Sequence, residues 1–94
     1  MKLNTRLATY DDKRFIFSTW LLSSKAYIKA ISWEERRSSV QALVDSCVLW
    51  VCYPNDDRDI ILGWTALLNG ARMWTYVQKD ARGCGIMHKL MGEH

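Results

Sequence analysis

A long stretch of β-forming residues, interrupted by two turns between residues 47 and 78, most constrains the fold. Its first part is a continuous apolar run, which is typical of a strand buried on both faces. Pro54 and the residues after it form a turn. Asn69-Gly70 is the strongest two-residue hairpin signal, because both residues tolerate positive φ. The predicted strands are 47–53, 59–67 and 72–78. We therefore expect an antiparallel meander.

Helical patterns precede this meander. Alternation over 3–8 predicts a first strand, and Thr9 with Asp12 resembles a capping box that starts a helix ending near Ser23. Ser32 and Glu35 form a second, cleaner box. The second helix has an apolar stripe at i, i+3, i+4 and i+7: Val40, Leu43, Val44 and Cys47. Residues 24–31 fit either an extension of the first helix or a loop.

Composition limits the class of protein. The 94 residues are 49% hydrophobic, which excludes intrinsic disorder and predicts one domain over 1–94. No apolar run approaches the length of a membrane span, so we expect a cytoplasmic domain with no membrane partner. The net charge of +3 is spread among acids, which argues against nucleic-acid binding. Three cysteines without a CxxC pair indicate neither a disulfide framework nor a metal site.

The segment Arg82-Gly83-Cys84-Gly85-Ile86 follows a predicted strand and opens a predicted helix over 86–91. Glycines at such a junction let an anion approach backbone N–H groups, so the loop is a candidate phosphate cradle. It matches neither the P-loop nor G-x-G-x-x-G, since His88 stands where the third glycine belongs. On spacing alone, a tight turn without a ligand remains the alternative.

The order β-α-α-β-β-β-α followed by this loop resembles the GNAT (Gcn5-related) N-acetyltransferase fold. The segments that resemble the family are 6–9, 11–12, 15–21, 61–64, 76–77 and 82–86, together with Leu90. In the signature Q/R-x-x-G-x-G/A, Arg82 and Gly85 fill the first two positions, and Met87 stands where a small residue is expected. The first segments and the meander are similar to small acetyltransferase-like proteins encoded by phages.

This resemblance implies an α+β fold, filed as α/β in some schemes. Its sheet would be mixed and mainly antiparallel, without the family's C-terminal strand and helix elements. It also implies acetyl-CoA, or CoA, as cofactor. The backbone of Tyr76, Val77 and Gln78 would pair with the pantetheine amides. The pyrophosphate would be held by the amides of Arg82, Gly83, Cys84, Gly85, Ile86 and Met87.

The implied reaction is direct attack on the thioester, near Val77, by an amine of a protein or small molecule. Whether the chain is an enzyme stays open, because 71–78 lacks the acidic residue that the family often uses as a base. The alternative is a non-catalytic, phage-type protein that uses a degenerate GNAT scaffold to bind and modulate a host protein. Without the missing elements, the last strand is an exposed edge that a second copy (a dimer) or a host protein would cover.

Several side chains have two interpretations. Cys84 is either a reactive thiol or a small loop residue, and Cys84 with His88 supplies too few ligands for a metal. Trp20, Trp33 and Tyr27 lie where the family places its acceptor-binding loop, so they either contact substrate or pack ordinarily. Trp50, Trp64 and Trp74 fall on three successive strands, where some are core and others are candidates for a covered surface.

Overall fold

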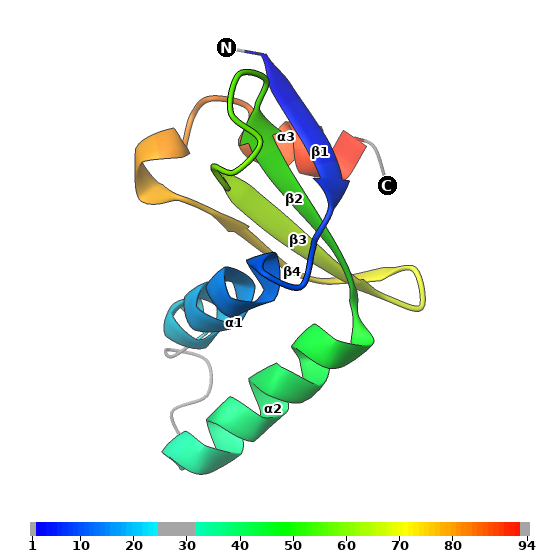
Figure 1. Ribbon diagram of the computed structural model, residues 1–94. Helices are drawn as coiled ribbons and strands as arrows, with labels where there is room; N and C mark the ends of the chain where they lie inside the picture. The colour runs from blue at the N-terminus through cyan, green and yellow to red at the C-terminus, as the bar shows by residue number, and fades with distance from the viewer. Residues whose placement is uncertain (1, 25–31, 93–94) are drawn as a thin grey trace.

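The computed structural model describes residues 2–24 and 32–92. The strands are β1 (Leu3–Leu7), β2 (Val48–Pro54), β3 (Gly63–Leu68) and β4 (Ala71–Val77). The helices are α1 (Asp12–Ser23), α2 (Trp33–Ser46) and α3 (Ile86–Gly92), with a 3-10 turn, η2 (Lys79–Ala81), before α3 (Figure 1). The predicted α+β class and element order are confirmed.

The described strands form one sheet in the order β1-β2-β3-β4. Each neighbouring pair is antiparallel, with Val51 opposite Trp64 and Trp64 opposite Tyr76. Asn69 (φ 52°) and Gly70 (φ 81°) both have positive φ, so the predicted hairpin turn between β3 and β4 is confirmed. The mainly antiparallel character expected of the sheet is therefore present.

Three predicted boundaries of the meander were wrong. Cys47 caps the end of α2 instead of starting a strand, and Pro54 pairs with Leu3 inside β2 instead of forming the turn. Residues 59–62 are not part of β3, because the Leu62 N–H donates to the Cys52 carbonyl outside the regular register (2.8 Å). The chain between β2 and β3 is consequently a longer connection than the sequence pattern indicated.

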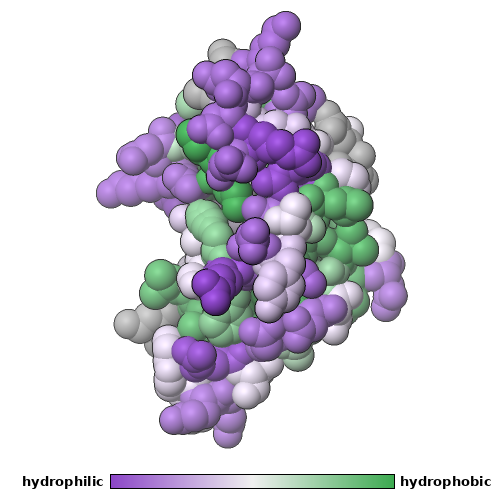
Figure 2. Space-filling model, viewed as in Figure 1, coloured by the Kyte–Doolittle hydropathy of each residue, from purple (hydrophilic) through white to green (hydrophobic). Residues whose placement is uncertain are grey.

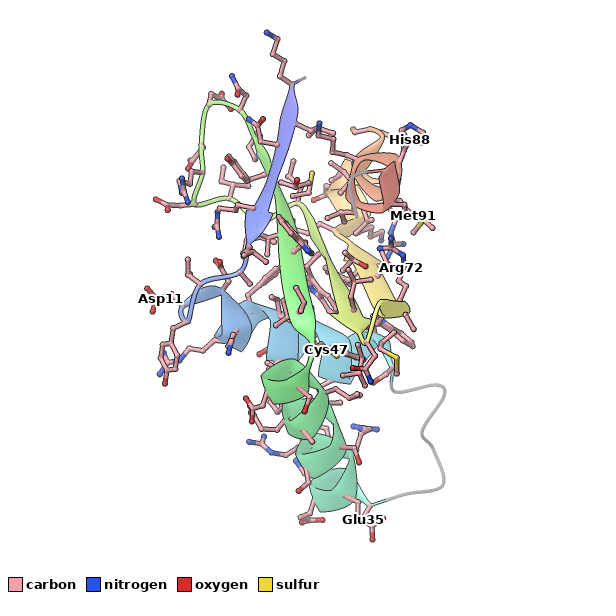
Figure 3. The ribbon with its side chains drawn as sticks, turned by 90° about the vertical axis from the view of Figure 1, so that its right-hand side faces the viewer. Asp11, Glu35, Cys47, Arg72, His88 and Met91 are labelled. Carbon is pink, nitrogen blue, oxygen red and sulfur yellow. The ribbon has the colours of Figure 1, made fainter. Side chains whose placement is uncertain are left out.

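The helices cover the two faces of the sheet (Figures 1 and 3). Helices α1 and α2 pack on one face around the fully buried Trp64, and α3 packs on the other through Ile86 and Leu90.

The side chains of β2 are not all buried to the same extent. Val51 and Cys52 are fully buried on opposite faces, whereas Val48 is 52% exposed. The expectation of a strand buried on both faces holds only in the middle of β2.

The apolar stripe of α2 faces the core as predicted. Val40 and Val44 are each 1% exposed, while Leu43 and Cys47 pack at the border of the same cluster. Figure 2 shows one face of the whole molecule. Hydrophilic side chains cover both ends of this face, and apolar groups gather over its middle.

The two helix starts differ from each other. The Ser32 hydroxyl accepts the Glu35 N–H (3.2 Å), which confirms the predicted cap of α2. At α1 only half of the capping box expected of Thr9 and Asp12 forms. The Thr9 hydroxyl donates to the Asp12 carboxylate, which also accepts the Thr9 N–H (2.7 Å). The carboxylate is the stronger local acceptor, so the hydroxyl does not accept a helix N–H. The sequence left two alternatives for residues 24–31, a helix extension or a loop. Residues 25–31 lie outside the described residues.

Candidate functional site

A groove of about 510 Å³ runs along the end of β4 and the loop before α3. Its lining is Ser23, Trp74, Thr75, Tyr76, Val77, Arg82, Gly83, Gly85, Ile86, Met87 and His88. The lining includes all the sequence-predicted cofactor-binding residues except Gln78 and Cys84. The structure therefore brings most of these residues to one surface, at the volume typical of small-molecule sites, about 300–1,000 Å³.

The loop before α3 has its shape because of two glycines. Gly83 (φ 88°) and Gly85 (φ 84°) adopt the left-handed region that other residues rarely enter. A Cβ at either position would meet no described atom within 4 Å, so the backbone there is open to an approaching ligand. The spacing of glycines in the sequence predicted this property.

Hydrogen bonds decide which loop amides can meet a ligand. The N–H groups of Arg82 and Cys84 donate within the loop, to Lys79 (3.4 Å) and Ala81 (3.3 Å). Lys89 makes the first bond of α3, to the Gly85 carbonyl (3.0 Å), so the amides of Ile86 and Met87 precede the helical bonding pattern. The amides best placed for an anion are accordingly those of the two glycines and the first turn of α3.

At the end of β4, too, some backbone groups are already bonded within the protein and others face outward. The Gln78 N–H donates to the Leu62 carbonyl (2.9 Å), on the β3 side of the strand. The N–H and C=O groups of successive residues point to alternate sides of an antiparallel strand. The N–H and C=O of Val77 therefore face away from β3. Arg82 Nε reaches the Val77 carbonyl from that outer side (3.3 Å). Among the three residues expected to pair with pantetheine, Val77 is the one whose backbone faces outward.

Gly63 sets how closely α3 approaches the sheet. A Cβ at Gly63 would lie 2.6 Å from the Tyr76 carbonyl oxygen and 2.8 Å from Ile86 Cγ2, so only glycine fits. Gly63 falls within the strand predicted over 59–67, and this close contact with α3 was not expected there. An isolated glycine in a strand pattern is the signal that could have indicated close packing.

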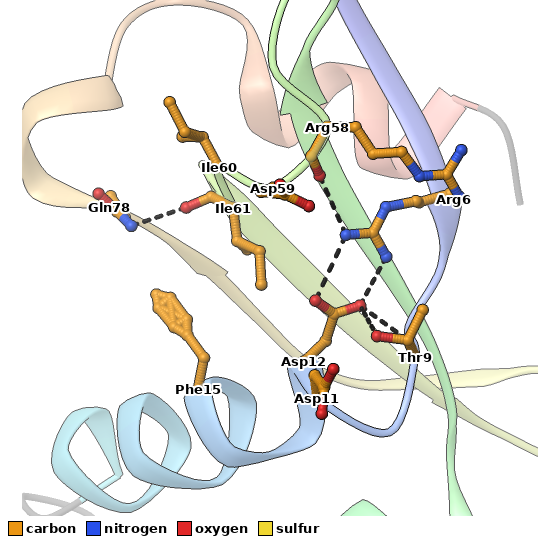
Figure 4. Close-up of a pocket in the computed structure, with 10 residues that line it drawn as sticks. All are labelled: Arg6, Thr9, Asp11, Asp12, Phe15, Arg58, Asp59, Ile60, Ile61 and Gln78. Atoms are coloured by element: carbon orange, nitrogen blue, oxygen red, sulfur yellow. Dashed lines mark hydrogen bonds and ion pairs between the residues drawn. The ribbon is translucent and has the colours of Figure 1, made fainter.

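A second cavity, of about 700 Å³, lies in front of the sheet between β1, the start of α1 and the β2–β3 connection (Figure 4). Its lining is Arg6, Thr9, Asp11, Asp12, Phe15, Arg58, Asp59, Ile60, Ile61 and Gln78. The sequence pattern did not indicate this cavity, because it predicts Asp12 only as part of a helix cap and Asp59 as the first residue of a strand. The four segments meet only in the folded chain.

An ion pair between Arg6 and Asp12 occupies one end of this acid–base cavity. Arg6 Nη1 lies 2.5 Å from Asp12 Oδ2, Nη2 lies 3.3 Å from Oδ1, and Nη2 also donates to the Arg58 carbonyl (3.1 Å). Burial favours the neutral acid, but hydrogen bonds from Arg6 and Thr9 outweigh it and hold the pKa of Asp12 below its ordinary value. The hydrogen bond to Asp12 raises the pKa of Arg6, so both groups are charged at neutral pH.

The other sequence candidates lie apart from both cavities or in the core. Trp20 is 3% exposed and packs 5.1 Å from the Trp64 ring, which is ordinary core packing. Trp33 is 48% exposed beside the Arg36 guanidinium (4.7 Å). Tyr27 lies outside the described residues. Cys84 is exposed.

The described residues contain neither a cluster of metal ligands nor a helix that could span a membrane. No three His, Cys, Asp or Glu side chains in 2–24 and 32–92 gather as a metal site would require. Within the same ranges, no helix has both the length and the apolar character needed to cross a membrane.

No protein-family model and no curated protein matches this sequence. Solved structures do match. Apo-form YjaB from Escherichia coli has a TM-score of 0.69 at 23% identity, over 98% of this chain and 63% of its own. A possible acetyltransferase from Clostridium difficile 630 has a TM-score of 0.70 at 19% identity, over 98% of this chain and 68% of its own.

A third similar structure is AAC(6')-Iy in complex with a bisubstrate analog, CoA-S-monomethyl-acetylneamine. Its TM-score is 0.55 at 10% identity, over 98% of this chain and 68% of its own. These neighbours are GNAT acetyltransferases, and at these identities the likeness establishes the fold. The chain spans 63% of the length of YjaB. It therefore has the GNAT fold over the part of those proteins that it matches.

Proposed function

We propose that this chain binds acetyl-CoA in the groove along β4 and transfers the acetyl group to an amine of a protein or a small molecule. The observation behind the proposal is the groove itself. In a GNAT fold, the end of β4 is followed, after the short turn η2, by a loop whose two positive-φ glycines leave its backbone open. The structure of AAC(6')-Iy with a CoA analog supports a CoA ligand for a chain of this fold.

The chain's own groups suit this cofactor. The amides of Gly83, Gly85, Ile86 and Met87 offer donors to a pyrophosphate at a loop-to-helix junction, where negative charge is stabilised. The outward-facing backbone of Val77 offers its N–H to the pantetheine amides, as an added strand would, while its carbonyl accepts from Arg82 Nε (3.3 Å). When bound, acetyl-CoA supplies the thioester that serves as acyl donor.

Positioning is the contribution to catalysis that these residues can make. The groove lining contains no carboxylate, and its titratable side chains are Tyr76, Arg82 and His88. Holding the amine and the thioester together at the end of β4 replaces a bimolecular encounter with a preorganised one, which accelerates acyl transfer without a dedicated base.

Calorimetric titration with acetyl-CoA tests the proposal. We expect saturable binding that Gly85→Trp abolishes, because the indole would occupy the loop face. Gly70→Trp is the matched control: Gly70 also has positive φ (81°) and open space, but lies in the β3–β4 hairpin away from the groove. Absence of binding at millimolar cofactor, or equal loss in both variants, would contradict the proposal.

A second candidate function is the binding of a partner protein or a second copy of the chain. The observation that favours it is the exposure of large side chains before α1, on α1 and at the start of α2: Tyr10 is 84% exposed, Leu22 70% and Trp33 48%. Trp33 lies beside Arg36 and Arg37, and Trp and Arg are enriched in protein interfaces. Light scattering across concentrations tests self-association. A mass of one chain throughout contradicts a dimer.

A further inference from the structure

The acid–base cavity and the cofactor groove meet at the end of β4. Val77 lines the groove, and the next residue, Gln78, lines the cavity. The Phe15 ring of the cavity contacts the Tyr76 ring of the groove edge to face, with centroids 6.3 Å apart. Successive side chains of a strand point to opposite faces, so Tyr76 of the groove and Gln78 of the cavity, two residues apart, point to the same face, and the two spaces are neighbours there.

The lining of the cavity is divided into a charged end and an apolar end. Figure 4 shows Arg6, Asp12 and Asp59 together on one side, with Phe15 and Gln78 on the other. Ile60 and Ile61 contribute apolar surface between them. A ligand with an alkyl body and a polar end would match this division.

The charges of the cavity favour a cation. Three carboxylates and two guanidinium groups line it, a formal balance of −1. Asp12 is occupied, because its oxygens accept from Arg6 and from both polar groups of Thr9. Asp11 points outward from the start of α1 (Figure 3), and the Arg58 side chain extends away from Phe15 and Gln78 (Figure 4). Asp59 is the remaining carboxylate of the lining; its charge helps to raise the pKa of Arg6, but no side-chain hydrogen bond to Arg6 holds it as one holds Asp12.

We infer that this cavity receives the acceptor, and that the acceptor is an alkyl amine with a second positive charge. The inference rests on the proposed acetyl transfer. The reacting amine lies at the Gln78 end, the alkyl chain lies against Phe15 and Ile61, and the distal cation faces Asp59. In the transfer, the neutral amine nitrogen forms a bond to the acetyl carbon and the carbon–sulfur bond breaks. The proton lost by the nitrogen goes to the thiolate, which leaves as the CoA thiol.

Two amines of equal chain length provide the test. Hexamethylenediamine has a distal cation, and ε-aminocaproate has a distal carboxylate. Each is titrated into the isotope-labelled full chain while backbone amide signals are followed by NMR. We expect the diamine to shift the signals of Asp59, Ile61 and Gln78 and to bind about tenfold more tightly than the aminocarboxylate, since one opposite charge replaces one like charge.

Asp59→Asn removes the proposed contact, and Asp56→Asn is its matched control in the same exposed connection but outside the lining. We expect Asp59→Asn to abolish the preference for the diamine and Asp56→Asn to preserve it. Equal affinity for the two amines, shifts confined to other residues, or equal effects of the two variants would overturn the inference.

A parallel titration with acetyl-CoA follows the backbone amide signals of Gly83 and Gly85, which report on the groove independently of the cavity. Cofactor shifts there without an amine preference at the cavity overturn the acceptor assignment alone. Absence of cofactor shifts overturns the proposed function, and the acceptor assignment that rests on it falls with it. Transfer of acetyl from acetyl-CoA to the diamine, measured by mass spectrometry and reduced about tenfold in kcat/KM by Asp59→Asn, supports both.

Discussion

The cofactor groove and the acid–base cavity are built in opposite ways. The groove is formed mainly by one continuous stretch, from Trp74 to His88, and its distinctive groups are backbone amides and glycines. The cavity is formed by side chains from four separate segments, held by the Arg6–Asp12 pair. A backbone site depends on local conformation, whereas a side-chain site depends on tertiary packing. Substitutions should therefore affect the two sites independently, except where the chain links them.

The largest effect is expected at Gly63, where β3, β4 and α3 meet. Gly63→Ala places a methyl group against the Tyr76 carbonyl and Ile86, and we expect it to lower the free energy of unfolding by about 2–3 kcal/mol. Acetyl-CoA affinity should fall as well, because α3 carries part of the groove. Urea unfolding and calorimetry measure the two quantities. A change in stability below about 0.5 kcal/mol would show that the contact is relieved without cost.

Asp12→Asn should damage the cavity and leave the groove intact. Loss of the ion pair leaves the mostly buried Arg6 without its carboxylate, and we expect a loss of about 2 kcal/mol in stability. Acetyl-CoA affinity should not change. Asp11→Asn, one residue away and exposed, is the control and should be near neutral. A parallel loss of cofactor affinity in Asp12→Asn would contradict the independence of the two sites.

The same pair predicts a pH dependence of stability. The folded pKa of Asp12 is lowered, so its stabilising contribution is fully present above the ordinary carboxyl pKa, about 4, and is lost as pH falls toward the lower folded value. The difference in Tm between the wild type and Asp12→Asn should thus stay constant from neutral pH to about 5 and shrink below about 4. A difference that does not change with acidification would contradict the assignment.

Gly85→Ala and Gly70→Ala provide a matched pair for the groove. Both residues have nearly the same positive φ, 84° and 81°, so each substitution should cost about 1 kcal/mol of stability through backbone strain. Only Gly85→Ala should weaken acetyl-CoA binding, by about tenfold, because only Gly85 borders the groove. Equal cofactor affinities in the two variants would argue that the loop does not bind the cofactor.

The smallest effect is expected at Gln78, the link between the two sites. Its side-chain amide donates to the Ile61 carbonyl (2.6 Å), and Gln78→Ala should cost about 1 kcal/mol. The backbone N–H of residue 78 donates to the Leu62 carbonyl and does not depend on the side chain. The end of β4 should therefore keep its position in Gln78→Ala. Thermal unfolding gives the stability, and retained affinity for acetyl-CoA would check the position of the strand.

This contrast explains what the sequence could predict. Asn69-Gly70 and the glycines before α3 have local conformational requirements, so the hairpin and the open loop were predictable from residue type alone. Residues 59–62 look like strand by composition, but a bond between Leu62 and Cys52 outside the regular register removes them from β3. The partnership of Arg6 with Asp12 and Arg58 depends on segments brought together by the sheet, which no local pattern reports.

A structure of the protein with bound CoA tests the central claim most directly. The account predicts the pyrophosphate within hydrogen-bonding distance of the amides of Gly83, Gly85, Ile86 or Met87, the pantetheine beside the outward backbone of Val77, and the acid–base cavity open to solvent. Cofactor ordered in the acid–base cavity, or against any surface other than the groove along β4, would contradict it.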